Sequence, residues 1–241
     1  MPEPLPPPLP PAQRTVGQLL AESMRLYGQR FWRALPLGLP LALVDQAVLG
    51  QEAEVRIALF ALGAPLLAGS YAFASALAAD TTLGARAATV AVATGTVVLL
   101  PASLMIVWFA LLAAAYLALV GLVVPVAVIE RRGALGALRR AGDLARADYV
   151  HALGSIAALA LVFFVARIGL VALLRAQAEN TVRAAVFLAD VALGPILFLG
   201  AALLYFDQEA RLSARPRGGR MRRAGARKPR SSVRSVKSGK G

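Results

Sequence analysis

The sequence contains no cysteine and only one histidine among its 241 residues. Without cysteine, the chain can form neither a disulfide bond nor a thiolate metal site. The single histidine, His151, also disfavours a metal site built from several imidazole ligands. A Gly-rich phosphate-binding loop is missing as well. We therefore predict neither a bound metal nor a cofactor.

Arrangements of catalytic side chains are equally scarce. Ser70 and Ser155 each follow a glycine, but neither stands in the Gly-x-Ser-x-Gly pattern of a hydrolase or beside a paired base. His151 stands where a long apolar stretch begins. We interpret it as an anchor at the membrane interface, with a role as a catalytic base as the alternative. The sequence therefore predicts a protein that is not an enzyme.

Charged residues are missing from long stretches of the chain. Hydrophobic residues make up 58% of the sequence, which is more than a soluble globular domain of average composition contains. Ala87–Ile129 runs for 43 residues without a charge. One helix of that length would be about 64 Å long, roughly twice the thickness of the bilayer hydrocarbon. We therefore expect two spans there, with a turn between Pro101 and Phe109.

Six apolar stretches of sufficient length predict an all-α membrane protein with six transmembrane helices. Pro36 and Pro40 should kink the first of these helices. The predicted spans are Phe31–Leu49, Val55–Ala79, two within Ala87–Ile129, Val150–Leu174 and approximately Arg183–Phe206.

Two amphipathic segments predict helices that lie in the membrane interface. Thr15 and Gln18 fit a capping box, and the helix they begin should end near Gly28. The second segment is Ala134–Val150, with its arginines on one face and Asp148 as a misfit on the apolar face. Its predicted apolar face consists of Leu135, Leu138, Ala141, Gly142, Ala145 and Tyr149. This segment is interpreted as a loop that fixes topology, as a surface helix docked on neighbouring helix ends, or as a ligand-binding helix.

The two ends of the chain differ in composition from residues 14–210, which we predict to form the six-helix transmembrane domain. Residues 1–13 contain seven prolines and should be disordered. Residues 211–241 contain twelve Lys or Arg and no acid, and we predict a disordered basic tail in the cytoplasm. The expected partners of this tail are anionic lipid head groups, or else a specific protein. Specific nucleic-acid binding is not expected, because the tail has no aromatic residue for base stacking.

The distribution of basic residues predicts the orientation of the spans. In the six-span arrangement, 22 of the 26 Lys and Arg residues lie on the side of both termini, and three lie on the other side. Cytoplasmic loops of membrane proteins carry such an excess. We therefore expect both termini in the cytoplasm.

Three ionisable residues lie within the predicted spans. Arg167 and Asp190 occupy adjacent antiparallel spans at equal depth, so we predict that they pair. Asp45 lies somewhat shallower and could join them. Intramembrane charges are costly, and they indicate either a polar pocket or ion path or a buried ion pair that fixes helix packing.

A second group of charges is expected at the cytoplasmic face. Glu130 ends the fourth span, Arg139 and Arg140 follow it, and Asp207 and Glu209 end the sixth span. We hypothesise an ionic latch between the central helix and the end of the sixth span. The alternative is a set of solvated helix ends.

Three segments share a pattern with a known family: Thr15–Trp32, Pro125–Tyr149 and Ala202–Leu212. Together they resemble the membrane domain of glycerophosphoryl diester phosphodiesterases, a domain that also forms stand-alone bacterial proteins. Ala141 stands where this family usually has Ser. Nothing in the chain corresponds to the catalytic barrel of those enzymes, so the resemblance implies a bacterial membrane module rather than a phosphodiesterase.

Together these features predict a non-enzymatic integral membrane protein of the bacterial cytoplasmic membrane. It would scaffold or assist another membrane or envelope component. The alternative is a small transporter or lipid-handling protein that uses Asp45, Arg167 and Asp190.

Overall fold

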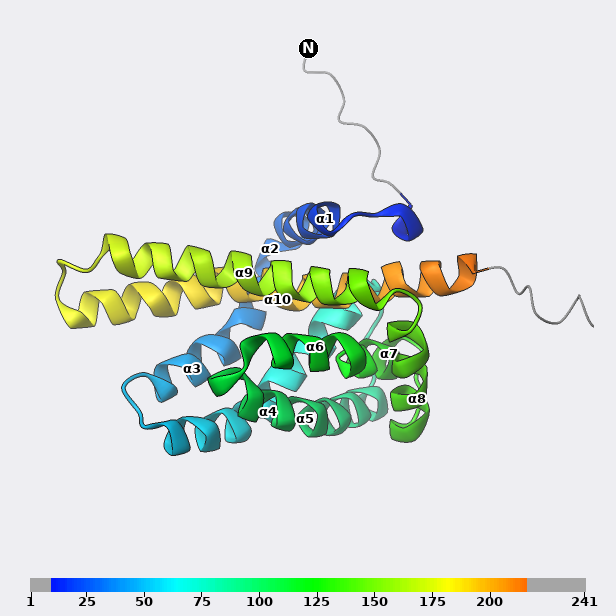
Figure 1. The fold of residues 1–241 in the computed structure, drawn as a ribbon, viewed down its shortest axis with the longest axis horizontal. Helices are drawn as coiled ribbons and strands as arrows, with labels where there is room; N and C mark the ends of the chain where they lie inside the picture. The colour runs from blue at the N-terminus through cyan, green and yellow to red at the C-terminus, as the bar shows by residue number, and fades with distance from the viewer. Residues whose placement is uncertain (1–9, 216–241) are drawn as a thin grey trace, which may run out of the picture.

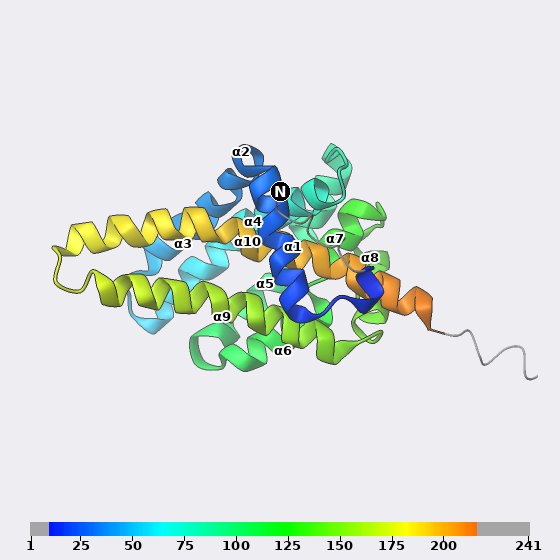
Figure 2. The ribbon, with the colours of Figure 1, turned by 90° about the horizontal axis from the view of Figure 1, so that it is seen from above.

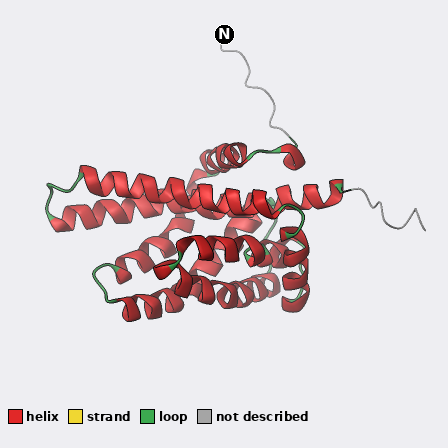
Figure 3. Cartoon of the chain, in the orientation of Figure 1, coloured by secondary structure: helices red, strands yellow, loops and turns green. Residues whose placement is uncertain are grey.

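The computed structural model describes residues 10–215, and every regular element in this range is a helix (Figure 3). Five helical segments within this range are long and apolar enough to cross a membrane. They are α4 (Ala53–Ala78), α5 (Ala85–Trp108), α6 (Ala110–Val120) followed directly by α7 (Val123–Ile129), α9 (Tyr149–Leu173) and α10 (Glu179–Ala214). The chain is thus a multi-pass membrane protein, and its described part is entirely helical.

The predicted first span is not one continuous helix. It is divided into α2 (Phe31–Ala34), the 3-10 helix η2 (Leu35–Leu37) and α3 (Gly38–Val48). Pro36 lies at the interruption, which confirms the expected distortion. The 11 residues of α3 extend only about 16 Å, too short to cross the hydrocarbon on their own. The predicted span over Phe31–Leu49 is therefore interrupted rather than only kinked, and none of its pieces is long enough to cross a membrane alone.

The uncharged run of 43 residues turns at Phe109, between α5 and α6. This position is the last residue of the predicted window, so the prediction of two segments joined by a turn is confirmed. Phe109 has φ −140° and ψ 66°, which is outside the helical region and ends α5.

The long helices lie side by side, and two shorter helices lie across them. Figures 1 and 2 show α9 and α10 next to each other along the long axis of the molecule. Helix α1 (Val16–Gln29) crosses over both of them (Figure 2). Helix α8 (Ala134–Ala145) lies across the end of the bundle where α10 finishes (Figure 1).

Local sequence signals explain where the short helices begin and end. Thr15 accepts a hydrogen bond from the Gln18 backbone, and the Gln18 side chain accepts one from the Thr15 backbone, so the predicted capping box is confirmed. The predicted helix Ala134–Val150 is instead two elements, because α8 ends at Ala145 and α9 begins at Tyr149.

The side of α8 that packs inward also differs from the prediction. Leu135 and Leu138 are 74% and 45% exposed, whereas Ala137 and Leu144 are fully buried. The inward face of α8 therefore consists mainly of small side chains, which let it lie close to α6 and α7.

The membrane-facing character of the bundle is visible on α9. This helix exposes large apolar side chains along one side: Leu161, Val165, Ile168 and Leu173. An apolar surface of this kind is unfavourable in water and favourable against lipid.

Helix α3 packs against α10 at very short range. A Cβ atom added at Gly38 would lie 2.2 Å from the backbone oxygen of Val191, and one at Gly194 would lie 2.9 Å from the Cα of Gly38. Small residues allow such backbone contact between helices in membranes. This contact places α3 beside Asp190, the residue before Val191.

The predicted domain boundaries shift slightly at both ends. Pro11–Gln13 forms a 3-10 helix, η1, although the proline-rich segment was expected to be irregular up to residue 13. Helix α10 continues to Ala214, four residues beyond the predicted limit at residue 210. The remainder of the two predicted disordered segments, residues 1–9 and 216–241, lies outside the described residues.

Candidate functional site

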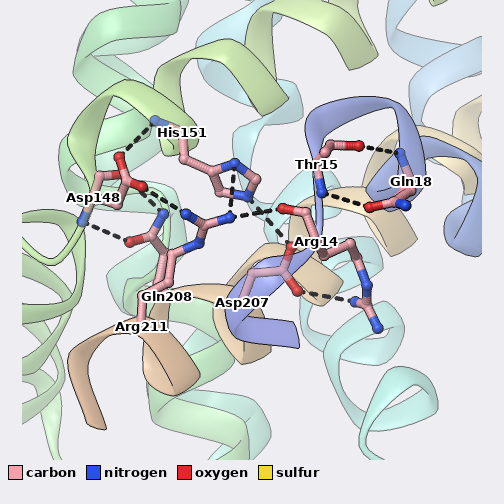
Figure 4. Close-up of polar contacts among 8 residues, drawn as sticks. All are labelled: Arg14, Thr15, Gln18, Asp148, His151, Asp207, Gln208 and Arg211. Carbon is pink, nitrogen blue, oxygen red and sulfur yellow. Dashed lines mark hydrogen bonds and ion pairs between the residues drawn. The ribbon is translucent and has the colours of Figure 1, made fainter. Parts of the chain in front are cut away.

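A network of polar side chains joins the start of α1, the start of α9 and the end of α10 (Figure 4). We call it the terminal network, and its members are Arg14, Asp148, His151, Asp207, Gln208 and Arg211. At its centre the Arg14 guanidinium donates to Oδ1 of Asp207 at 2.9 Å. The Asp207 side chain is completely buried. A buried carboxylate requires such a partner, because its desolvation is otherwise uncompensated.

His151 lies between Asp207 and Arg211. Its Nε2 is 3.4 Å from Oδ2 of Asp207, and its Nδ1 is 3.3 Å from an Nη of Arg211. An arginine can only donate, so Nδ1 must accept, and the ring proton belongs on Nε2, where it can be donated to Asp207. The geometry therefore fits a neutral imidazole that bridges the two charged groups. His151 is buried and hydrogen-bonded rather than only an anchor at the interface.

Asp148 explains the boundary between α8 and α9. Its Oδ1 accepts a hydrogen bond from the His151 backbone at 3.0 Å, so Asp148 caps the N-terminus of α9. Its backbone N–H and carbonyl both bond the side chain of Gln208. Its Oδ2 accepts from Arg211 at 2.7 Å. The apparent misfit on an amphipathic helix is thus a helix cap that also ties α9 to α10.

Sequence reasoning missed most of this network. Arg14 and Arg211 are separated by 197 residues, yet Arg211 donates to the backbone oxygen of Arg14 at 2.7 Å. No local pattern predicts a contact over that separation. The capping role of Asp148 could have been recognised from the sequence. An aspartate directly before a long apolar run is typical of a helix N-cap.

The hypothesised ionic latch forms with some of its predicted members. Arg140 of α8 donates to Oε1 of Glu130 at 2.9 Å and lies 3.7 Å from Glu209 of α10. Tyr205 of α10 donates its hydroxyl to the same Glu130 oxygen at 3.0 Å. Arg132 contacts the other oxygen at 2.5 Å. We call these residues the Glu130 cluster.

Two predicted members of the latch lie elsewhere. Arg139 is exposed and makes no ion pair within residues 10–215. Asp207 belongs to the terminal network instead. Adjacent residues on a helix point in different directions, so Arg139 faces away when Arg140 faces Glu130.

The environment of Glu130 favours its ionised form. Burial by itself raises the pKa of this carboxyl, but hydrogen bonds from Arg140, Arg132 and Tyr205 lower the pKa more strongly. The net pKa is below the ordinary glutamate value. The Glu130 hydrogen bond in turn raises the pKa of Arg140. The cluster therefore consists of mutually stabilised charges.

The three intramembrane charges do lie together, but they pair differently from the prediction. Arg167 of α9 donates from both Nη atoms to the carboxylate of Asp45 in α3, at 2.7 Å to Oδ1. Asp190 of α10 is completely buried, and neither of its oxygens has a hydrogen-bond partner among the described residues. The predicted Arg167–Asp190 pair is therefore wrong, and Asp45 is the partner of Arg167 instead. We call these three residues the intramembrane cluster.

Two cavities lie between the helices. One of about 240 Å³ is lined almost entirely by apolar side chains of the long helices, with Tyr71 and Ser103 as its polar members. The other, of about 450 Å³, lies where α5 and α8 begin and is lined by three arginines, Arg86, Arg131 and Arg132. The second cavity therefore concentrates positive charge near the Glu130 cluster.

Comparison of the chain with protein-family models, with curated proteins and with solved structures finds no match in any of the three.

Proposed function

We propose that the chain crosses the bacterial cytoplasmic membrane six times, with α2, η2 and α3 together as an interrupted first span. The support comes from the contact between Arg14 and Asp207 at 2.9 Å. Because this contact joins Arg14, which lies between η1 and α1, to the last crossing helix, both lie on one side of the membrane. An even number of crossings must then separate them, and the five long helices alone give an odd number.

In this arrangement α1 and α8 are the two interfacial helices. Both lie across the direction of the long helices (Figures 1 and 2). The excess of basic residues in residues 211–241 favours the cytoplasm as the side of both termini.

A set of single-cysteine variants tests this topology, since the natural chain has no cysteine. We expect Arg25→Cys on α1 to be protected from a membrane-impermeant maleimide in intact cells, and Gln51→Cys, after α3, to be labelled. Gln177→Cys, between α9 and α10, should be labelled as well. If Arg25→Cys and Gln51→Cys label alike, then α2, η2 and α3 do not cross the membrane.

The biochemical role that we propose is that of a non-enzymatic membrane module that scaffolds or assists another membrane or envelope component. The terminal network carries this proposal. It fixes three segments of the chain to one another at one end of the bundle by the buried Arg14–Asp207 ion pair, the hydrogen-bonded His151 and the partly buried Arg211–Asp148 pair. Such contacts give a rigid surface, and rigid surfaces suit docking of a partner without an ordering cost. The resemblance of three segments to a membrane domain without its catalytic barrel agrees with this role.

The expected lipid partners are anionic head groups at the same end. Arg86, Arg131 and Arg132 line a cavity there, and the basic residues 216–241 follow directly from the end of α10. Each basic residue near an anionic leaflet contributes up to about 1 kcal/mol to membrane attachment.

Affinity purification from the native membrane in mild detergent, with mass spectrometry of proteins and lipids, tests the role. We expect a stoichiometric protein partner that is lost in Asp207→Ala and kept in Asp143→Asn, a variant at an exposed acid of α8. Retention of a specific lipid or small molecule without any protein would instead favour the transporter or lipid-handling alternative.

A further inference from the structure

Asp190 is the one acid of the intramembrane cluster without a hydrogen bond. Its residue exposure is 0%, and both carboxyl oxygens lack a partner among the described residues. The backbone next to Asp190 is tightly packed, because Val191 and Gly194 lie against Gly38 of α3. An ionised carboxylate in such a site would lose its hydration without compensation.

The neighbouring charges do not neutralise Asp190. The charged groups that act on it are Arg167 from α9 and Asp45 from α3. Both Nη atoms of Arg167 are already bonded to Asp45. With all three residues ionised, the cluster would carry one positive and two negative charges. A single proton makes the cluster neutral, which is the favoured state in a region of low dielectric constant.

We propose that Asp190 is a proton-binding site within the membrane, and that Asp45 relays its proton to water. In the protonated state Asp190 is a neutral carboxylic acid, while the Asp45 carboxylate is held by Arg167. Asp45 lies three residues before the end of α3 and keeps 13% side-chain exposure, whereas Asp190 has none, so the shorter route to the membrane surface passes through Asp45.

Proton release follows from the same contacts. The Asp190 proton passes to an Asp45 oxygen, and Asp45 then gives it to water at its exposed edge. The negative charge left on Asp190 attracts the Arg167 guanidinium, whose flexible side chain can move its hydrogen bonds from Asp45 to Asp190. The cluster thus has two charge arrangements. Arg167 pairs with Asp45 when Asp190 is protonated, and with Asp190 after the proton has left. This inference goes beyond the module role and does not depend on it.

Infrared spectroscopy of the protein in vesicles of phosphatidylethanolamine and phosphatidylglycerol tests the site. A protonated carboxyl gives a C=O band that an ionised one lacks. Spectra are recorded between about pH 5 and pH 9, above the ordinary aspartate pKa, where other aspartates are ionised. We expect this band in the natural protein and in Glu179→Gln, a control at an exposed acid of α10. The pH-dependent part of this band, measured as a difference spectrum in which the constant ester C=O absorption of the lipids cancels, should be missing in Asp190→Asn.

Folding of Asp190→Asn provides a second measurement. Asparagine resembles the neutral acid in shape, so this variant should fold, and it should unfold at the same temperature as the natural protein at pH values where the band is present. A band that Asp190→Asn leaves unchanged would overturn the proposal. So would a variant that fails to fold, because that result would show that the negative charge of Asp190 is required.

Discussion

Arg167 directs both of its terminal nitrogens at Asp45, although its charge also acts on Asp190. The bidentate contact joins α9 to α3, so it connects the interrupted helix to the bundle. An arginine fork bonded to one carboxylate is a strong and geometrically specific pair. The two acids of the intramembrane cluster therefore have different roles, and substitution should separate them.

Removal of Asp45 should destabilise the protein far more than removal of Asp190. At a pH where Asp190 is protonated, Asp45→Ala leaves Arg167 without a charged partner, and we expect the free energy of unfolding to fall by roughly 3–5 kcal/mol, as for other buried pairs that lose one member. Chemical unfolding in detergent micelles measures this change. The control is Glu179→Ala, which breaks an exposed pair with Arg183 and should cost less than about 1 kcal/mol. Equal losses of unfolding free energy in Asp45→Ala and Glu179→Ala would contradict the assignment of Asp45 as the buried partner of Arg167.

Arg14 and Asp207 should show strong energetic coupling. Each single alanine substitution leaves the other group uncompensated, so we expect each to cost several kcal/mol and the double variant to cost less than their sum. Unfolding of the four proteins of a double-mutant cycle gives the coupling free energy. Asp143→Asn, at an exposed position of α8, serves as the reference for a surface change. Strict additivity would show that the contact does not contribute.

The Glu130 cluster should make stability depend on acid pH. The pKa of Glu130 is lower in the folded protein than its ordinary value of 4.5, so near that pH the unfolded chain binds more protons than the folded one. The stabilisation by Glu130 is complete above pH 4.5 and is lost as the pH falls through the lower folded pKa. Melting temperatures measured over this range should fall more steeply for the natural protein than for Glu130→Gln. Parallel curves would contradict the prediction.

The backbone contact between α3 and α10 should not tolerate a side chain. Gly38→Ala places a methyl group 2.2 Å from the Val191 oxygen, so the two helices must move apart. We expect a large loss of stability. The Arg167–Asp45 pair should also weaken, because it joins α9 to the displaced α3. Gly69→Ala is the matched control, because a Cβ at this helical position meets nothing within 4 Å. That variant should be neutral or slightly stabilising, since alanine favours a helix.

The sequence was sufficient to predict the long helices. The length of an apolar stretch gives the length of the helix that it forms. The predicted spans Val55–Ala79 and Val150–Leu174 therefore differ by only one or two residues from α4 and α9 at each end. The turn at Phe109 followed from the same argument, because a single membrane-spanning helix could not accommodate 43 uncharged residues. The broken segment before α4 was harder to predict, because proline signals a distortion without specifying its size.

Pairing between side chains could not be predicted in the same way. Counting residues gives the depth of Arg167, Asp45 and Asp190 in the membrane, and all three do meet. It does not give the rotation of each helix about its axis, which decides which acid faces the guanidinium. The backbone contact of Gly38 with Val191 fixes part of that rotation, and no local pattern reveals it.

The contact between Arg14 and Asp207 has a consequence for how the molecule is made. The two residues are 193 positions apart, and the ribosome synthesises the chain from the N-terminus. Arg14 therefore emerges first but has no carboxylate to bind until the last helix has entered the membrane. Helix α1 can therefore take its final position over α9 and α10 only after both helices have been synthesised. A segment made early in synthesis is thus fixed in place by a contact that forms late.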